Sequence, residues 1–393
     1  MSAVLPIFNR SKLNFSHGEG MYLYTPEGEE YLDFAAGIAV NALGYSHPKL
    51  VAALTEQGKK FWHISNLYQI PQMDSLAEKL VKHSFADKVF FCNSGAEAIE
   101  CGIKMTRKYH DETGHPEKYR MICFHGAFHG RTLAAISAGE PGKNSRGFEP
   151  LVEGFDHVPF GDIEAVRQAI TPETGGILIE PILGEGGIKP APEGFLKALR
   201  TLCDEHGLLL FCDEVQAGMG RTGKLFSHEW AGIAPDLCAS AKGIGGGFPL
   251  GACLATDKAA QGMKPGTHGS TYGSNPLAMA VGNAVIDAIM APGFLKNVIA
   301  QGDDLKARLE KLQERFPKVI AEVRGKGLML GLKLQVANTD FLEALRAERL
   351  LAVAASDNVI RIMPPLILEQ KHIDQAMPRF EAACAAVLKP KAA

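Results

Sequence analysis

Residues 208–214 read LLLFCDE, a run of five apolar residues followed by two carboxylates. A short apolar run without alternation predicts a strand buried on both faces, as in a parallel sheet covered by helices. Similar runs begin at Lys88 (KVFFC), Arg120 (RMICF), Gly176 (GILIE) and Leu250 (LGACLA). These segments predict an α/β fold with a mostly parallel sheet. Such sheets bind ligands beyond the carboxyl ends of their strands, so we expect the chemistry there.

Helical segments alternate with these strands. Helices are expected over residues 47–60, 71–82 and 96–110, and Pro71 suits the first position of a helix. From about residue 287 the pattern changes to a long charged helix, a strand pair and two closing helices, which predicts a smaller α+β unit. These later segments are residues 305–316, 322–334 (EVRGKGLMLGLKL), 339–350 and 370–387.

The length of the chain, 393 residues, favours two domains. Residues 46–286 are expected to form the large domain and residues 287–393 the small C-terminal domain. Residues 1–45 are expected to form an arm that packs with the small domain, and within it MYLYTPEGEEYLDF predicts a β-hairpin.

Charge and composition narrow the class of partner. The formal net charge is −3 at pH 7, which leaves no basic excess for nucleic acid or an anionic membrane, so small-molecule ligands are expected. No signal peptide or 20-residue apolar span is recognisable, which predicts a cytoplasmic protein. The eight cysteines form no CxxC pair and are expected to be reduced residues of the core.

Two nucleotide-binding patterns overlap at residues 218–225, GMGRTGKL. The triphosphate-binding loop requires Ser or Thr after its lysine, and Leu225 stands there. The dinucleotide pattern should open a helix directly after a strand, whereas four residues separate Asp213 from Gly218. Both matches are therefore expected to be accidental. His125 and His129 have the spacing of a helical metal site, but neighbouring glycines disfavour a helix there, and no metal is expected.

Other residues fit the requirements of pyridoxal phosphate, which needs a lysine, an acid at the ring nitrogen, an aromatic face and phosphate donors. Asp213 ends a predicted strand, where a carboxylate could keep the ring nitrogen protonated; an isolated aspartate would more often be a helix cap or turn residue. Lys242 follows an apolar segment and precedes a run of glycines, whereas most lysines are surface residues. The next residue after Asp213, Glu214, should point to the opposite face of the strand.

A phosphate cradle is expected at the start of the helix after KVFFC. In FCNSGAEA, residues Ser94, Gly95 and Ala96 would present free backbone amides and the positive end of the helix dipole to an anion. The alternative is an ordinary Ser-Gly helix start with Glu97 in its first turn.

The order of the motifs resembles that of the class III aminotransferases. NSGAEA, FHGRT, EPILGEGG, DEVQAGMGRTG, SAKGIGGGFPLGA and GTHGSTYGSNPLA follow one another between Tyr22 and Pro365. Together with VRGKGLMLGL and RIMPPL they are most similar to the acetylornithine aminotransferases of arginine biosynthesis. The resemblance implies fold type I of pyridoxal-phosphate enzymes, with a seven-stranded type of sheet. It also implies a homodimer with shared active sites.

The resemblance assigns roles toward the cofactor. Lys242 is implied as the Schiff-base lysine and proton carrier, Asp213 as the partner of the ring nitrogen, and Phe128 as the stacking residue. Further cofactor contacts are implied for Ser94, Gly95, Ala96, Glu214, Val215, Gln216 at the phenolic oxygen, and Thr271 from the neighbouring subunit.

The resemblance also implies substrate contacts. Arg131 and Ser270 are expected to contact the substrate, and Arg361 to hold the α-carboxylate of glutamate or 2-oxoglutarate through its planar fork. Glu185 is expected to pair with Arg361 in one half-reaction and release it in the other. Gln69 and Ile70 follow NLY where relatives often have a second aromatic residue, which leaves the acyl preference open.

The implied reaction is a ping-pong exchange: acetylornithine gives its δ-amino group to the cofactor, and 2-oxoglutarate then takes it and becomes glutamate. Succinylornithine, succinyldiaminopimelate, ornithine and 4-aminobutyrate aminotransferases would use nearly the same residues. A non-catalytic cofactor-binding protein and a nicotinamide-dependent oxidoreductase remain alternatives from other classes.

Overall fold

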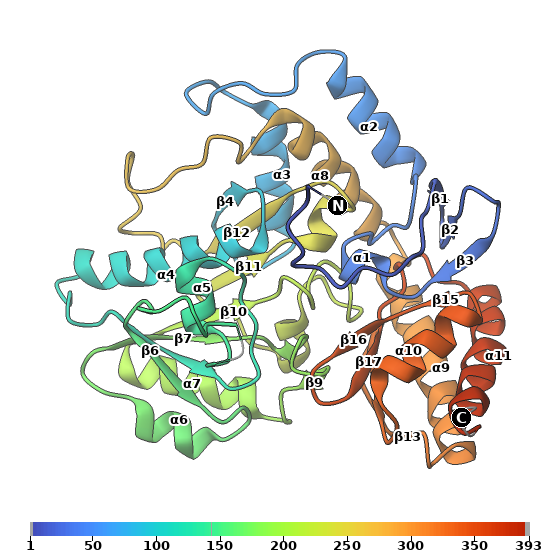
Figure 1. The fold of residues 1–393 in the computed structure, drawn as a ribbon. Helices are drawn as coiled ribbons and strands as arrows, with labels where there is room; N and C mark the ends of the chain where they lie inside the picture. Colours follow the sequence, from blue (N-terminus) through green and yellow to red (C-terminus); the bar gives the residue numbers. More distant parts are fainter. Residues whose placement is uncertain (1–2, 143, 390–393) are drawn as a thin grey trace.

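A computed structural model describes residues 3–142 and 144–389 of the chain (Figure 1). Its largest sheet has seven strands in the order β4-β12-β11-β10-β7-β5-β6. Only β12 runs antiparallel to its neighbours, so the predicted mostly parallel sheet is confirmed. In sheet order the strands are Lys88–Cys92, Gly251–Ala255, Leu237–Ser240, Leu209–Asp213, Thr174–Ile179, Arg120–Phe124 and Phe155–Val158.

Each of the five predicted strands is present. Two strands of the sheet were not predicted as such: β6 reads FDHV, whose two polar residues interrupt the apolar run, and β11 reads LCAS. The structure gives β11 a specific importance, because Lys242 lies two residues beyond its end.

Helices cover both faces of this sheet. Leu209 and Phe211 of β10 pack in one core cluster with α4 (Gly95–Glu112), whereas Leu210 and Cys212 pack in another with α7 (Phe195–His206). Successive side chains of β10 point to opposite faces, and helices cover both faces. An apolar residue is therefore needed at every position of the strand. The other helices around this sheet are α2 (Pro48–Gly58), α3 (Pro71–Lys82), α5 (Leu133–Ala138), α6 (Ile163–Ala169) and α8 (Pro276–Ile289).

Local sequence explains where several helices begin. Prolines occupy the first turn of α2, α3 and α8, where the missing N–H costs no hydrogen bond. Ser94 caps α4 because its side chain accepts a hydrogen bond from the N–H of Glu97 at 3.3 Å. Asn275 caps α8 in the same way, through the N–H of Ala278 at 2.9 Å.

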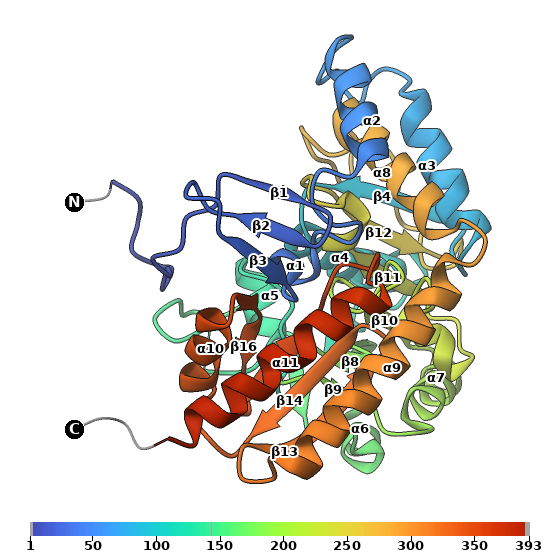
Figure 2. The same ribbon diagram turned by 90° about the vertical axis from the view of Figure 1, so that its right-hand side faces the viewer.

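The C-terminal part forms a second layer of sheet and helices. The sheet has the order β13-β14-β17-β16, and every pair in it is antiparallel. Figure 2 shows α9 and α11 lying across one side of this sheet. α9 is longer than the predicted helix at 305–316, because it begins at Phe294. The elements are α9 (Phe294–Arg315), β13 (Ile320–Lys326), β14 (Met329–Leu334), α10 (Asn338–Ala347), β16 (Val353–Ala355), β17 (Val359–Ile362) and α11 (Gln370–Val387).

The N-terminal segment contains the predicted hairpin, formed by β2 (Tyr22–Tyr24) and β3 (Glu30–Asp33), with β1 (His17–Glu19) beside it. β3 also pairs in parallel with β15 (Leu350–Leu351), which comes from the C-terminal part of the chain. A short α1 (Ala36–Ala39) follows the hairpin, and β8 (Ile182–Leu183) pairs with β9 (Lys189–Pro190) in a small separate ribbon.

The glycine-rich stretch at residues 218–225 does not open an α-helix. It forms turns that lead to the 3-10 helix η1 (Ser227–Ala231), and the buried Arg221 donates to the carbonyl oxygen of Leu328 at 3.1 Å. The stretch thus joins the two parts of the chain. The helix that a dinucleotide fingerprint requires does not follow it.

Within the described residues, no single helix has the length and apolar composition to span a membrane. α8 and α9 pass that test only together, as a pair bent by 69° at their break.

Candidate active site

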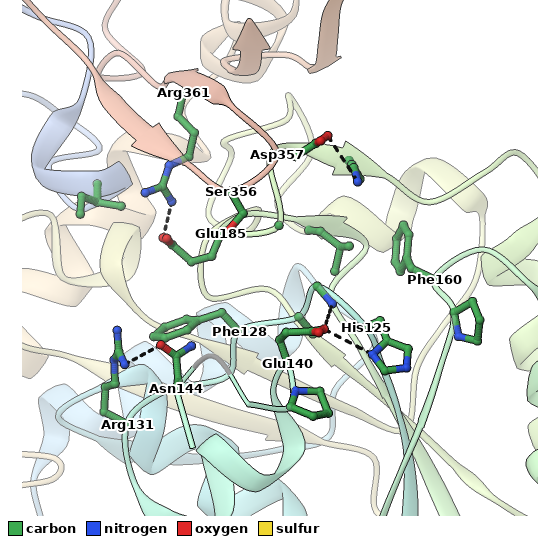
Figure 3. Close-up of a pocket in the computed structure, with 18 of the residues that line it drawn as sticks. His125, Phe128, Arg131, Glu140, Asn144, Phe160, Glu185, Ser356, Asp357 and Arg361 are labelled. Carbon is green, nitrogen blue, oxygen red and sulfur yellow. Dashed lines mark hydrogen bonds and ion pairs between the residues drawn. The ribbon is translucent and has the colours of Figure 1, made fainter. Parts of the chain in front are cut away.

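A cavity of about 440 Å³ lies beyond the carboxyl ends of strands of the large sheet. Nine of the residues proposed from the sequence line it: Ser94, Gly95, Ala96, Phe128, Arg131, Asp213, Val215, Gln216 and Lys242. A wider cavity of about 1090 Å³ shares Phe128, Arg131 and Lys242 with it and adds Glu185 and Arg361 (Figure 3). The fold therefore brings most of the predicted site residues to two cavities that share part of their lining.

Lys242 begins a single 3-10 turn, η2 (Lys242–Gly245), which Ala241 separates from the end of β11. Its backbone is left-handed, with φ of 50°, which is uncommon for a residue with a side chain. Burial lowers the pKa of its ammonium group; the charge of Glu185 opposes this shift, and that of Arg361 adds to it. A lowered pKa increases the fraction of neutral amine, which is the nucleophilic form.

Asp213 is the last residue of β10, and its carboxylate is buried. Its Oδ1 accepts a hydrogen bond from the N–H of Val215 at 3.0 Å, and its Oδ2 lies 2.7 Å from Nδ1 of His129. Nε2 of His129 has no hydrogen-bond partner in the described chain. His125 faces Glu140 instead, at 3.4 Å, so the two histidines do not share one site.

Glu180 is a second buried carboxylate that lines the smaller cavity, and it is not among the residues predicted from the sequence. Its two oxygens accept hydrogen bonds from the N–H of Phe128 at 2.8 Å and of Gly184 at 2.9 Å. The signal was available, because GILIE ends in a carboxylate in the same way as LLLFCDE. The spacing of His129 from His125 points only to a metal site, whereas its contact with Asp213 depends on the tertiary fold.

The amino end of α4 forms another wall of the cavity through Ser94, Gly95 and Ala96. A Cβ atom at Gly95 would lie 2.9 Å from Cγ1 of Val215, so a side chain would not fit there. Backbone N–H groups of a first helical turn have no intrahelical acceptor, and the helix dipole favours an anion at that end. The wall therefore suits a phosphate group.

Glu214 is not brought into the cavity. Its Oε1 accepts a hydrogen bond from the N–H of His228 at 2.7 Å and lies 3.1 Å from Nδ1 of the same residue. The side chain of Glu214 therefore does not lie where it could make the cofactor contact that the resemblance implies. The physical reason is the alternation of side chains along an extended backbone, which sends Asp213 and Glu214 to opposite faces.

Two arginines face the wider cavity from different elements. Arg361 of β17 is 2% exposed and forms an ion pair with Glu185, while Gln216 accepts from it at 3.3 Å. Arg131 donates to Oδ1 of Asn144 at 2.8 Å, and its guanidinium carbon lies 5.2 Å from the ring centroid of Phe128. Figure 3 shows the Arg361–Glu185 pair on one side of the cavity and Arg131 on the other.

Ser270 and Thr271 do not line either of these cavities in the same chain. Oγ of Ser270 accepts from Nδ2 of Asn93 at 3.2 Å, and Asn93 does line the smaller cavity. Thr271 is exposed. Its predicted contact with the cofactor of a neighbouring subunit stays a prediction.

The residues present fit pyridoxal phosphate. The half-buried Lys242 can carry the aldehyde carbon, Asp213 can face the ring nitrogen, and the amino end of α4 can take the phosphate. Among the described residues there is no group of three potential ligands arranged for a metal ion. The arrangement is therefore suited to chemistry at an amine beside an acidic partner and two carboxylate-binding guanidinium groups.

Comparisons with known proteins agree with this geometry. The family model described as aminotransferase class-III matches residues 8–384. A relative from Mesorhizobium japonicum named acetylornithine aminotransferase is 60% identical over 381 residues, which cover 97% of this chain and 96% of the relative.

Two solved structures are also similar. The N-acetylornithine aminotransferase from Stenotrophomonas maltophilia K279a has a TM-score of 0.85 and 39% identity, with 97% of each chain covered. The ornithine aminotransferase from Toxoplasma gondii, described with partial occupancy of PLP at its active site, has a TM-score of 0.93 and 28% identity, with 97% and 92% covered. The chain thus belongs to the class III aminotransferases, enzymes that transfer amino groups with pyridoxal phosphate as cofactor.

Proposed function

We propose that this enzyme transfers the δ-amino group of N2-acetyl-L-ornithine to 2-oxoglutarate, giving N-acetyl-L-glutamate 5-semialdehyde and L-glutamate, as a step of L-arginine biosynthesis. One observation carries the proposal: a buried arginine, Arg361, is paired with Glu185 in the cavity that also contains Lys242. An arginine that can be neutralised suits an enzyme whose two substrates differ in charge near the reacting carbon.

The charge of Arg361 explains how one site can accept both substrates. When 2-oxoglutarate or glutamate binds, its α-carboxylate takes the fork of Arg361 and displaces Glu185. When acetylornithine presents its δ-amino end, no carboxylate lies at this position, so Glu185 keeps the buried guanidinium neutralised. Arg131, on the other side of the cavity, is left for the α-carboxylate of acetylornithine.

Pyridoxal phosphate, when bound, supplies an aldehyde carbon for attachment and a ring that withdraws electrons from the substrate carbon. Lys242 is the proposed point of attachment; once the amino group of the donor has replaced it there, the freed Nζ would take the proton from the amino-bearing carbon of the donor. Asp213 would keep the ring nitrogen protonated, and Phe128 would pack on the ring. Gln216 is the proposed contact of the phenolic oxygen, and Val215 would contact the ring.

Steady-state kinetics with a panel of amines tests the substrate. We expect the highest kcat/KM with acetylornithine, compared with succinylornithine, succinyldiaminopimelate, ornithine and 4-aminobutyrate. A higher kcat/KM for one of these amines would replace the proposed substrate and leave the aminotransferase chemistry intact.

We further propose that the enzyme is a homodimer whose subunits share their active sites. Large apolar side chains are exposed on two neighbouring loops, which hydrogen bonds from Asn66 to the carbonyl oxygens of Ser270 and Gly273 hold together. A second copy would cover this surface, because monomers rarely expose so many large side chains in one place. The exposed residues are Phe61, Trp62, Leu67, Tyr68 and Tyr272.

We also propose a cytoplasmic location. All eight cysteines are unpaired and buried, as expected in a reducing compartment. Fractionation of the source cells, with activity measured in each fraction, tests this.

A further inference from the structure

Glu180 connects two segments of the site. It follows β7 and is 5% exposed. One of its oxygens holds the N–H of Phe128, and the other holds the N–H of Gly184, which directly precedes Glu185. A single carboxylate thus links the segment that contains Phe128 to the segment that contains Gly184 and Glu185.

Charged groups surround this carboxylate. The side chains of Asp213 and His129 contact each other at 2.7 Å, and their charges shift the pKa of Glu180. The charge of Glu180 in turn raises the pKa of Lys242. Burial raises the pKa of Glu180 to about 7; the charge of Asp213 raises it too, while His129 and the two backbone N–H groups lower it. For Lys242, the remaining charged groups are Glu185, Arg361 and Asp213.

We propose that Glu180 is a positioning residue of this site: by holding two backbone N–H groups, its carboxylate sets the spacing of Phe128 and Gly184. The charge of Glu180 is also one of several that raise the pKa of Lys242. The proposal rests on the proposed transamination at Lys242. It assigns Glu180 no contact with substrate.

The hydrogen bonds require a carboxylate and not merely a side chain of this size. A glutamine would keep one oxygen for one backbone N–H but turn its NH₂ group toward the other. Two donors would then face each other in a buried place, and one of the two segments would be released. Aspartate keeps both acceptors and the charge but is shorter.

The test compares the parent with Glu180→Gln and Glu180→Asp, and uses Glu229→Gln as matched control. Glu229 is a partly buried carboxylate that accepts from the N–H of Phe226 at 2.7 Å and does not line the cavity. The first readout is the visible spectrum of each holoenzyme between pH 6 and 10. The second is hydrogen exchange of the cofactor-free proteins in peptides that contain Phe128 and Gly184.

We expect the pH of the spectral transition to fall in Glu180→Gln, because one of the negative charges that raise the pKa of Lys242 is removed. One of the two peptides should exchange faster. Glu180→Asp should keep the pH of the transition within a few tenths of a unit and lower kcat by roughly ten-fold, since its shorter side chain misplaces both segments. Glu229→Gln should change neither readout.

An unchanged spectral transition in Glu180→Gln, or unchanged exchange in both peptides, would overturn the proposal. If Glu180→Gln does not bind the cofactor, Glu180→Asp becomes the decisive variant. The proposal is then contradicted if the spectral transition of Glu180→Asp shifts by a full pH unit, or if its kcat equals that of the parent. Absence of a visible chromophore and of transamination in the parent enzyme would instead refute the proposed function.

Discussion

At the scale of single residues, Lys242 is the position on which the chemistry depends. Lys242→Ala should remove the borohydride-fixed cofactor, detected by mass spectrometry of the protein, and lower the rate by at least about 10²–10⁴-fold. Lys296→Ala, at an exposed position, serves as control and should keep both. A cofactor still fixed by borohydride in Lys242→Ala would contradict the assignment.

Asp213 is the next position to test. Asp213→Asn should lower kcat by about 10²–10³-fold, because a neutral amide does not favour a protonated ring nitrogen and because His129 loses its charged partner. Cofactor binding should be retained in part, as measured by titration of the absorbance. A rate within a few-fold of the parent would make Asp213 a structural residue.

Glu185 allows the two half-reactions to be separated. Arg361 is buried, and its Nε has no partner in the described chain, so loss of the Glu185 charge leaves a guanidinium without neutralisation. Glu185→Gln should slow the half-reaction with acetylornithine roughly ten-fold and leave that with glutamate equal or faster. Single-turnover absorbance measures each half-reaction, with the exposed Glu193→Gln as control. Equal slowing of both would exclude a switching role.

At the scale of elements, α4 illustrates how tertiary packing overrides helix propensity. Gly102 lies in its middle, where alanine would ordinarily stabilise the helix by roughly 1 kcal/mol. A Cβ atom there would come within 2.2 Å of the ring of Phe211 in β10. The glycine therefore sets how closely α4 approaches the sheet.

Gly102→Ala should accordingly lower the free energy of unfolding by about 1–3 kcal/mol, as measured by urea denaturation. Phe211→Leu in the same protein should recover part of the loss, because it removes the ring. Gly58→Ala is the matched control: it lies at the end of α2, and the nearest atom would be 3.8 Å away. A Gly102→Ala protein as stable as the parent would show that α4 can shift freely.

At the scale of the whole molecule, the proposed dimer links assembly to cofactor binding. Thr271 is exposed and lies beside Tyr272 on the apolar surface described above. If its hydroxyl binds the phosphate of the neighbouring subunit's cofactor, Thr271→Val should weaken cofactor affinity roughly ten- to a hundred-fold and lower the stability of the holo-dimer.

Sedimentation of the apo and holo forms, alongside cofactor titration, measures both effects. Thr201→Val removes a hydroxyl from the exposed side of α7 and should affect neither. A parent dimer that dissociates equally with and without cofactor, or an active monomer, would refute the shared site. The division into residues 1–45, 46–286 and 287–393 likewise stays a prediction.

Much of the fold could be predicted from local sequence. Runs such as LLLFCDE are apolar at every position because both faces of the sheet are covered, and this property belongs to the strand itself. Asp213 and Lys242 could be proposed because each stands at the end of such a run or shortly after it. β6 could not be predicted in this way, because two of its four residues are polar and interrupt the apolar run.

The polar network of the site was decided by the tertiary structure. His129 and Asp213 are 84 residues apart in sequence, and Arg361 and Glu185 are 176 apart, so no local pattern marks them as partners. They meet because the carboxyl ends of β5, β7 and β10 converge at one sheet edge and β17 approaches it from the C-terminal part of the chain. The sequence by itself determined which strands are buried and which residues end them; only the packing of distant segments decided which charges face one another.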